Sequence, residues 1–175
     1  QIGLLAGREV PLDVGVKLTG KLNRTEIGIL DVRTGDLEVG GRQLTDARNV
    51  FIGRVKQNFF QQSYIGAIVT SGNPAQPLSG HTVGADLRLS TSRLMGRSRN
   101  LIVNAYGLKT VNEGVSNKDW SYGFSAHYPN DKISAQVVLR EIQENFRPTL
   151  GFVQRDNVRL FRAAFSYNPR PKNFL

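Results

Sequence analysis

The chain has 175 residues, no cysteine and a formal net charge of +9. This length is enough for one domain with a sizeable core, and the lack of cysteine excludes disulfides and thiolate chemistry. No apolar run approaches the roughly 20 residues of a membrane-spanning helix, and the scattered Lys and Arg residues form no nucleic-acid reader motif, so nucleic acid is not expected as a partner.

Apolar and polar residues alternate with a period of two through most of the chain, and no helical period appears between these segments. We expect strands at residues 10–22, 26–34, 49–59, 63–70, 81–91, 101–110, 120–128, 133–140 and 157–168, and the tail of a further strand at residues 1–5. Residues 35–48 are expected to form a polar loop. The predicted fold class is all-β, an antiparallel up-and-down meander of about nine strands forming a single domain over residues 1–175.

The expected connections alternate between short and long. The short ones lie near Asn23, Phe60, Gly96 and Asn130, and the long ones lie near Gly40, Pro74, Gly114 and Pro148. A soluble meander has no need for this alternation, whereas an outer-membrane barrel has short turns on one side and long loops on the other. The expected strands, at about nine to twelve residues, also have the length of a tilted membrane strand. The pattern therefore predicts a segment of a transmembrane-type β-barrel.

The alternation divides the strand residues into two sets. In residues 120–140, one set is apolar and rich in aromatic residues, with Trp and Tyr near the strand ends, where a membrane interface favours them. The residues expected to face lipid are Trp120, Tyr122, Phe124, Tyr128, Phe161, Phe165 and Tyr167. The residues expected to face a polar lumen are Lys17, Arg54, Lys56, Asp86, Arg88, His127, Arg140 and Arg162. Asp86 is expected to pair with a nearby cation, and unpaired lumen cations would favour anionic solutes.

Alternation alone does not distinguish a membrane barrel from a soluble one. The alternative is a soluble up-and-down β-barrel that binds a small apolar or sugar ligand, with the apolar set inside and the charged set in water. An enzyme is not expected, because His81 and His127 are far apart and no nucleophile elbow, phosphate loop or dinucleotide fingerprint is present. No catalytic, cofactor-binding or metal-binding residue is predicted.

Nine strands is an unusual number for a barrel, since single-chain bacterial barrels have an even count. The chain also begins with Gln1 rather than Met. We therefore expect part of a larger barrel, whose remainder is supplied by the same protein or by another chain.

Several segments in this order carry a family resemblance. They are Gln1-Ile2-Gly3, residues 16–21, residues 49–55, Ser63-Tyr64-Ile65-Gly66 with Thr70, residues 83–86, Trp120-Ser121-Tyr122 and residues 146–155. Together they resemble a bacterial family of unknown function in which an outer-membrane β-barrel follows a periplasmic domain similar to the family-nine carbohydrate-binding modules. The resemblance covers nearly the whole chain. It implies that this is the first part of the barrel and that it lies in a bacterial outer membrane. From the connection lengths, the aromatic face and the resemblance together, we expect a pore, transporter or membrane anchor in the handling of carbohydrate or envelope material. The expected partners are the lipid bilayer and a saccharide or anionic solute.

Overall fold

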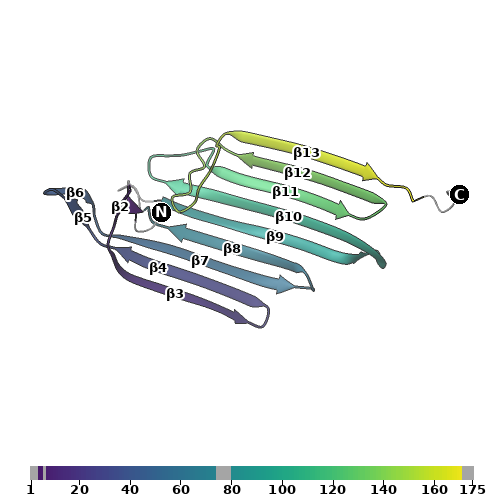
Figure 1. Ribbon diagram of the computed structural model, residues 1–175, viewed down its shortest axis with the longest axis horizontal. Helices are drawn as coiled ribbons and strands as arrows, with labels where there is room; N and C mark the ends of the chain where they lie inside the picture. Colours follow the sequence, from purple (N-terminus) through teal and green to yellow (C-terminus); the bar gives the residue numbers. More distant parts are fainter. Residues whose placement is uncertain (1–3, 6, 74–79, 171–175) are drawn as a thin grey trace.

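Nine strands lie side by side in one antiparallel sheet (Figure 1). The computed structural model describes residues 4–5, 7–73 and 80–170. In chain order the sheet contains β3 (Leu12–Leu22), β4 (Thr25–Thr34), β7 (Arg48–Phe59), β8 (Ser63–Ser71), β9 (Gly80–Leu94), β10 (Arg97–Asn112), β11 (Trp120–Pro129), β12 (Ile133–Ile142) and β13 (Val158–Tyr167). Each strand pairs with the next one in this order, and β3 and β13 form the two edges, so the predicted all-β, up-and-down meander is confirmed.

Two small hairpins lie outside the main sheet. β1 (Leu4–Leu5) pairs with β2 (Arg8–Glu9), and residues 1–3 of the strand tail expected there are outside the described part of the chain. β5 (Leu37–Val39) pairs with β6 (Arg42–Thr45), so the expectation of a plain loop at residues 35–48 was wrong. Gly40 and Gly41 both have positive φ, at 62° and 77°, which allows the tight turn between β5 and β6.

The short and long connections lie at opposite ends of the sheet. At the short-turn end, residues 23–24, 60–62, 95–96 and 130–132 link neighbouring strands. At the long-connection end, the links are residues 35–47, 72–79, 113–119 and 143–157, and residues 74–79 lie outside the described part. The alternation of connection length expected from the sequence is therefore present.

The β9–β10 hairpin is longer than the sequence pattern predicted. β9 has 15 residues and β10 has 16, and only Met95 and Gly96 separate them. Both turn residues have positive φ, at 52° and 73°, as a two-residue type I′ turn requires. The stretch between the expected strands 81–91 and 101–110 is thus strand, except for the two-residue turn at Met95 and Gly96.

Candidate functional site

The strand register assigns the side chains of the sheet to two faces, because residues paired across neighbouring strands point to the same side. The row through Phe124 contains Leu87, Ala105, Leu139 and Phe161, and we call this side the apolar face. The seven residues predicted to face lipid all lie on it. The eight residues predicted to face a lumen all lie on the opposite side, which we call the polar face. The register thus separates the two predicted sets, and it does not by itself identify what each face contacts.

The apolar face is extensive and largely uncovered. Its side chains include Leu18 at 59 % exposure, Phe161 at 68 % and Phe165 at 70 %. Among the described strand residues of this face, the charged ones lie toward the strand ends: Asp31, Arg33, Lys109, Glu141 and Arg159 toward the long-connection end, and Arg93 and Arg99 toward the short-turn end. The middle of the face is therefore an apolar band that crosses all nine strands.

On the polar face, Arg54 and Asp86 form a salt bridge across an intervening strand. Arg54 lies on β7 and Asp86 on β9, and Arg54 Nη2 is 2.9 Å from Asp86 Oδ1 and 3.1 Å from Oδ2. Gly66 on β8 lies between them. A Cβ at Gly66 would be 2.8 Å from Asp86 Oδ1 and 3.0 Å from Arg54 Nη2. The missing side chain at Gly66 therefore leaves room for the salt bridge.

A second polar cluster lies next to the first. Lys56 Nζ is 2.7 Å from Glu26 Oε2 and lies 5.2 Å from the centre of the Tyr64 ring, a cation–π contact. Asn58 Nδ2 donates to Glu26 Oε1 at 2.7 Å. Sequence reasoning missed Glu26, because its place beside Lys56 follows from the pairing of β4 with β7 and not from the spacing of residues along either strand.

The other residues that were predicted to face a lumen do not form a single site. Lys17, Arg88, Arg140 and Arg162 have no carboxylate within 4.0 Å among the described residues. His127 is paired in register with Ile102 and Gln136. Unpaired cations are thus distributed over the polar face, and they give it a positive character that the two ion pairs do not neutralise.

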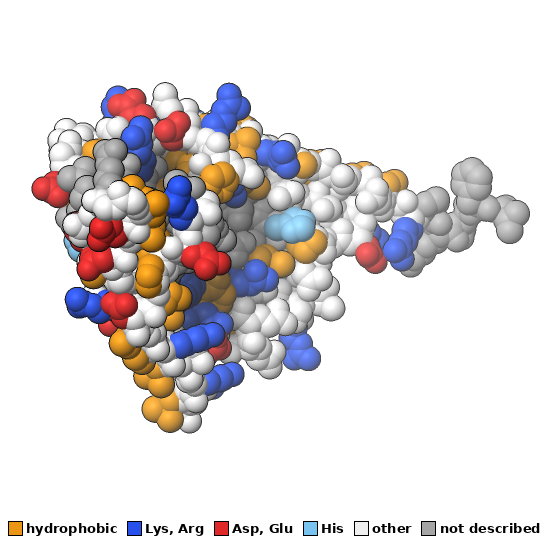
Figure 2. Space-filling view, turned by 60° about the vertical axis from the view of Figure 1, so that its left-hand side comes forward, with side chains coloured by type: hydrophobic (Ala, Val, Ile, Leu, Met, Phe, Trp, Pro, Cys, Tyr) orange, Lys and Arg blue, Asp and Glu red, His pale blue; other side chains and the backbone are white. Residues whose placement is uncertain are grey.

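The polar face is the more crowded side of the sheet. A Cβ at Gly84 would contact the Leu108 side chain, and a Cβ at Gly123 would be 2.5 Å from the Tyr106 ring. Glycines on both faces vary: a Cβ at Gly28 on the polar face or at Gly107 on the apolar face would have no described atom within 4 Å, and one at Gly53 on the apolar face would be 3.2 Å from the Phe51 ring. Figure 2, which brings the long-connection end forward, shows a hollow with Lys and Arg side chains around it. The buried side chains of Val50, Thr82, Thr110 and Ser121 all lie on the polar face, whereas Phe161 and Phe165 on the apolar face are exposed. This difference in burial indicates a sheet that curves around its polar face.

The connection between β12 and β13 folds back over the polar face at the long-connection end (Figure 1). Asn112 Nδ2 donates to the Arg147 carbonyl at 2.8 Å, and Thr149 Oγ1 donates to the Gly72 carbonyl at 2.6 Å. Phe146 is buried, with 4 % exposure. Although β12 and β13 are neighbours, their connection reaches as far as the end of β8.

No cluster of three or more His, Cys, Asp or Glu residues suited to a metal ion occurs in the described part of the chain. No helix among the described residues is long and apolar enough to cross a membrane. No protein-family model, curated protein or solved structure matches the chain. The family resemblance of its segments therefore stays a prediction.

Proposed function

We propose that this chain is a segment of an outer-membrane β-barrel that acts as a pore, transporter or membrane anchor, with its apolar face in the lipid and its polar face lining a water-filled interior. The observation that carries the proposal is the exposed apolar band across all nine strands, bordered by charged residues only toward the strand ends. In soluble monomers, contiguous exposed apolar patches rarely exceed a few hundred Å². A face of this extent needs an apolar environment, and lipid supplies one.

The dimensions of the strands agree with a membrane. The sheet strands have from 9 to 16 residues. A transmembrane strand tilted by about 45° needs about 9–11 residues to cross the hydrocarbon core. Trp120 and Tyr122 lie on the apolar face at the long-connection end, and Tyr128 and Tyr167 lie on it at the short-turn end. This arrangement corresponds to the two aromatic girdles of membrane barrels.

The chemistry of the polar face supports an anionic solute as the cargo. Arg88, Arg140 and Arg162 have no carboxylate partner in the described region, whereas the carboxylates of Glu26 and Asp86 are both paired. Rings of basic side chains favour anions in pores. A saccharide is a second proposed solute, which rests on the resemblance alone.

A barrel of this kind also needs partners for its edge strands. Among the described strands, β3 and β13 each pair on one side only. An open edge in hydrocarbon leaves backbone groups unsatisfied, at several kcal/mol for each group. We propose that further strands, from the same protein or from another chain, complete the barrel.

The soluble alternative, a barrel that binds an apolar or sugar ligand, needs the apolar face inside. The exposure of Phe161 and Phe165 and the burial of Val50 and Thr110 on the polar face favour the opposite curvature. The membrane proposal therefore accounts for the geometry better.

The experiment that tests the proposal compares lipid contact at Phe124 with that at Ser125, which are neighbours on opposite faces of β11. An environment-sensitive fluorophore is attached at each position in turn through Phe124→Cys or Ser125→Cys, and the chain is refolded into vesicles. We expect position 124 to be quenched by lipid-borne quenchers and position 125 by water-borne ones. If position 124 is protected from both quenchers while position 125 is reached from water, the apolar face is a protein core and the proposal fails.

A further inference from the structure

The β9–β10 hairpin extends past both of its neighbours at the short-turn end. Its register with β8 ends at Arg88, and its register with β11 ends at Ile102. The pairing of β9 with β10 continues to Leu94 and Arg97. Residues 91–100 therefore form an arm whose two outer edges pair with no other strand of the described chain, although the Asn130 side chain bonds the Asn100 backbone at its base.

The arm is basic and contains no acidic residue. It carries Arg93, Arg97 and Arg99, all exposed, and the sequence from residue 87 to residue 112 has no Asp or Glu. None of the three arginines lies within 4.0 Å of a carboxylate in the described part of the chain. Asp131, in the neighbouring β11–β12 turn, pairs with Arg170 at 3.1 Å. The arm's positive charge is therefore not neutralised by these side chains.

A β-bulge places two of these arginines opposite each other. The register shifts between Ser98 and Arg99, so that both residues face Arg93. Like charges directly opposite each other destabilise a strand pair. Bulges often re-aim a side chain at the rim of a barrel or beside a functional site. An anion bound between the two guanidinium groups would turn this repulsion into a favourable interaction, and arginine binds phosphate oxygens through paired N–H donors.

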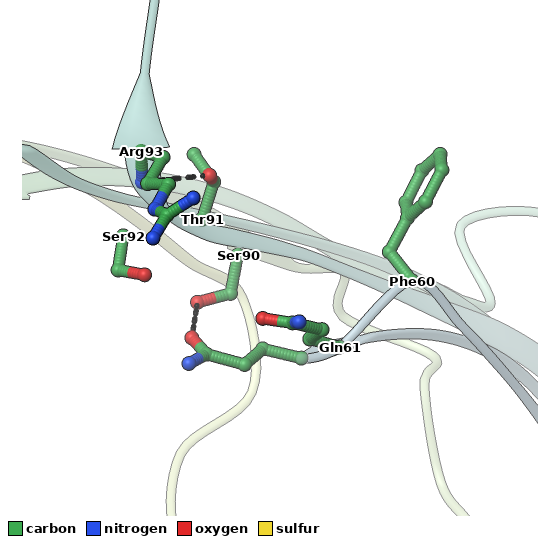
Figure 3. A pocket seen from close by; sticks show the side chains of 7 residues that line it. Phe60, Gln61, Ser90, Thr91, Ser92 and Arg93 are labelled. Carbon is green, nitrogen blue, oxygen red and sulfur yellow. Dashed lines mark hydrogen bonds between the residues drawn. The ribbon is translucent and has the colours of Figure 1, made fainter. Parts of the chain in front are cut away.

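Space for a ligand lies along both edges of the arm. The hollow beside β9 has a volume of about 590 Å³ and is lined by Arg93, Ser90, Ser92 and the β7–β8 turn. In Figure 3, Ser90 is hydrogen-bonded, and the Thr91 hydroxyl accepts from the Arg93 backbone N–H at 3.1 Å, while the Arg93 guanidinium has no drawn partner. On the other edge, a hollow of about 410 Å³ is lined by Arg99 and the β11–β12 turn. Each arginine of the pair thus borders open space.

The position of the pair on the apolar face indicates what kind of anion it meets. From the middle of the face toward the short-turn end, Leu89 pairs with Val103, and Leu101 with Thr91. Arg93 and Arg99 come next on the same face. The order is thus hydrocarbon-like side chains first and cations beyond them, as in a protein surface that passes from the lipid core into the headgroup layer.

We propose that Arg93 and Arg99 bind the phosphate of an anionic phospholipid in the leaflet at the short-turn end of the sheet. The inference rests on the proposed membrane location and adds a lipid-headgroup site to it. A lipid phosphate, rather than a free one, is favoured because the pair continues the apolar face and therefore holds the headgroup of a lipid whose acyl chains lie against Leu89, Leu101 and Val103.

The test uses the chain with Trp120→Phe, which removes its single tryptophan, and Leu101→Trp, which reports from beside Arg99. The protein is refolded into phosphatidylcholine vesicles that contain either brominated phosphatidylglycerol or brominated phosphatidylcholine. We expect stronger quenching by the anionic lipid. The preference should fall about fivefold for each arginine removed in R93Q/R99Q, because a cation near an anionic lipid surface contributes about that factor. The matched control is R140Q/R162Q, which removes the same charge from the polar face and should leave the preference unchanged.

The outcomes separate this inference from the proposed function. Quenching by both lipids without a preference, or an equal loss in R140Q/R162Q, overturns the phospholipid site while leaving the membrane location intact. No quenching by either lipid, both here and at Trp120 of the parent chain, overturns both. If added inorganic phosphate abolishes the preference for the anionic lipid, the site binds free phosphate. If polyglutamate binds in the absence of lipid, the partner is an acidic polypeptide. Either result overturns the lipid assignment. If Leu101→Trp does not fold, the phosphatidylglycerol retained by the parent chain and by R93Q/R99Q in native mass spectrometry decides the same question.

Discussion

Arg54 and Asp86 come from strands that do not touch, and their side chains meet over Gly66 on the strand between them. Alternate strands of a sheet are about 10 Å apart. The contact therefore needs both the long side chain of arginine and the missing side chain of glycine. The salt bridge thus links β7 directly to β9, whereas backbone hydrogen bonds link each of them only to β8 between them.

Removing the carboxylate should change the charge selectivity of the polar face. Asp86→Asn leaves Arg54 without its partner, so we expect a shift toward anion permeation, together with a loss of about 1 kcal/mol in the free energy of unfolding, since the pair is partly exposed. The reversal potential in a salt gradient across a planar bilayer measures the selectivity. Glu113→Gln makes the same change of charge in the β10–β11 connection and serves as the control. An equal shift of the reversal potential in both variants would mean that the net charge of the protein, and not the charge on the polar face, sets the selectivity.

A methyl group at Gly123 should displace the Tyr106 ring. The two residues are paired in register, and a Cβ at Gly123 would be 2.5 Å from the ring. We expect Gly123→Ala to lower the free energy of unfolding by about 1–3 kcal/mol, as for other overpacked sites. Gly107→Ala on the apolar face, where no atom is within 4 Å, should cost much less. Urea unfolding in lipid vesicles gives both values.

A double-mutant cycle shows whether the Tyr106 ring is the cause. In the presence of Tyr106→Ala, the cost of Gly123→Ala should largely disappear, which corresponds to a coupling of about 0.5–3 kcal/mol for residues in contact. Additive effects would place the strain in the backbone and contradict this explanation.

A charged residue introduced on the apolar face should lower the free energy of unfolding by an amount that depends on its depth in the bilayer. Phe124 lies near the middle of β11, and Trp120 begins it. In a bilayer, Phe124→Arg should cost about 2–4 kcal/mol, and Trp120→Arg about 0–1 kcal/mol. The measurement is the unfolding midpoint in urea for both variants, refolded into the same vesicles. Equal penalties at the two positions would argue against a membrane with its midplane near Phe124.

The β12–β13 connection should be lockable onto the sheet. The space that a Cβ of Gly80 would occupy is filled by the Thr149 side chain, so the double variant G80C/T149C brings two thiols within bonding distance. The chain has no other cysteine that could compete. We expect the disulfide to form under mild oxidation and to add about 2–4 kcal/mol to the free energy of unfolding. A change in electrophoretic mobility on reduction detects the bond, and its absence would show that the connection does not rest on β9.

Alternation of apolar and polar residues was sufficient to predict the strands and the face of each side chain, because the strand period of two is a local property. It was insufficient for the arm, since Thr91, Arg93 and Arg99 occupy apolar-face positions there and interrupt the alternation. It also missed the β5–β6 hairpin, whose strands have three and four residues.

The contacts within the polar face were less predictable than the faces themselves. Glu26 and Asn58 are separated by 32 positions in the sequence, as are Arg54 and Asp86. Each pair is brought together by the register of the strands, which the turns and loops between them set. The sequence indicated that Asp86 would pair with a cation on its own face, but not with which one. Lys56 is the β7 residue in register with Gly66 and Asp86, yet Asp86 pairs with Arg54, one same-face position along β7, and Lys56 pairs with Glu26. The path of residues 143–157 over the polar face had no local signal, because tertiary hydrogen bonds to Gly72 and Asn112 determine it.

The meander has an odd number of strands, which constrains how it can close. Consecutive strands reverse direction, so β3 and β13, the first and ninth of the sheet, run the same way. If these two edges met directly, they would form a parallel seam in an otherwise antiparallel ring. A ring without a parallel seam requires that whatever lies between the two edges contribute an odd number of strands. A closing piece with an even number would leave one parallel pair wherever it joined.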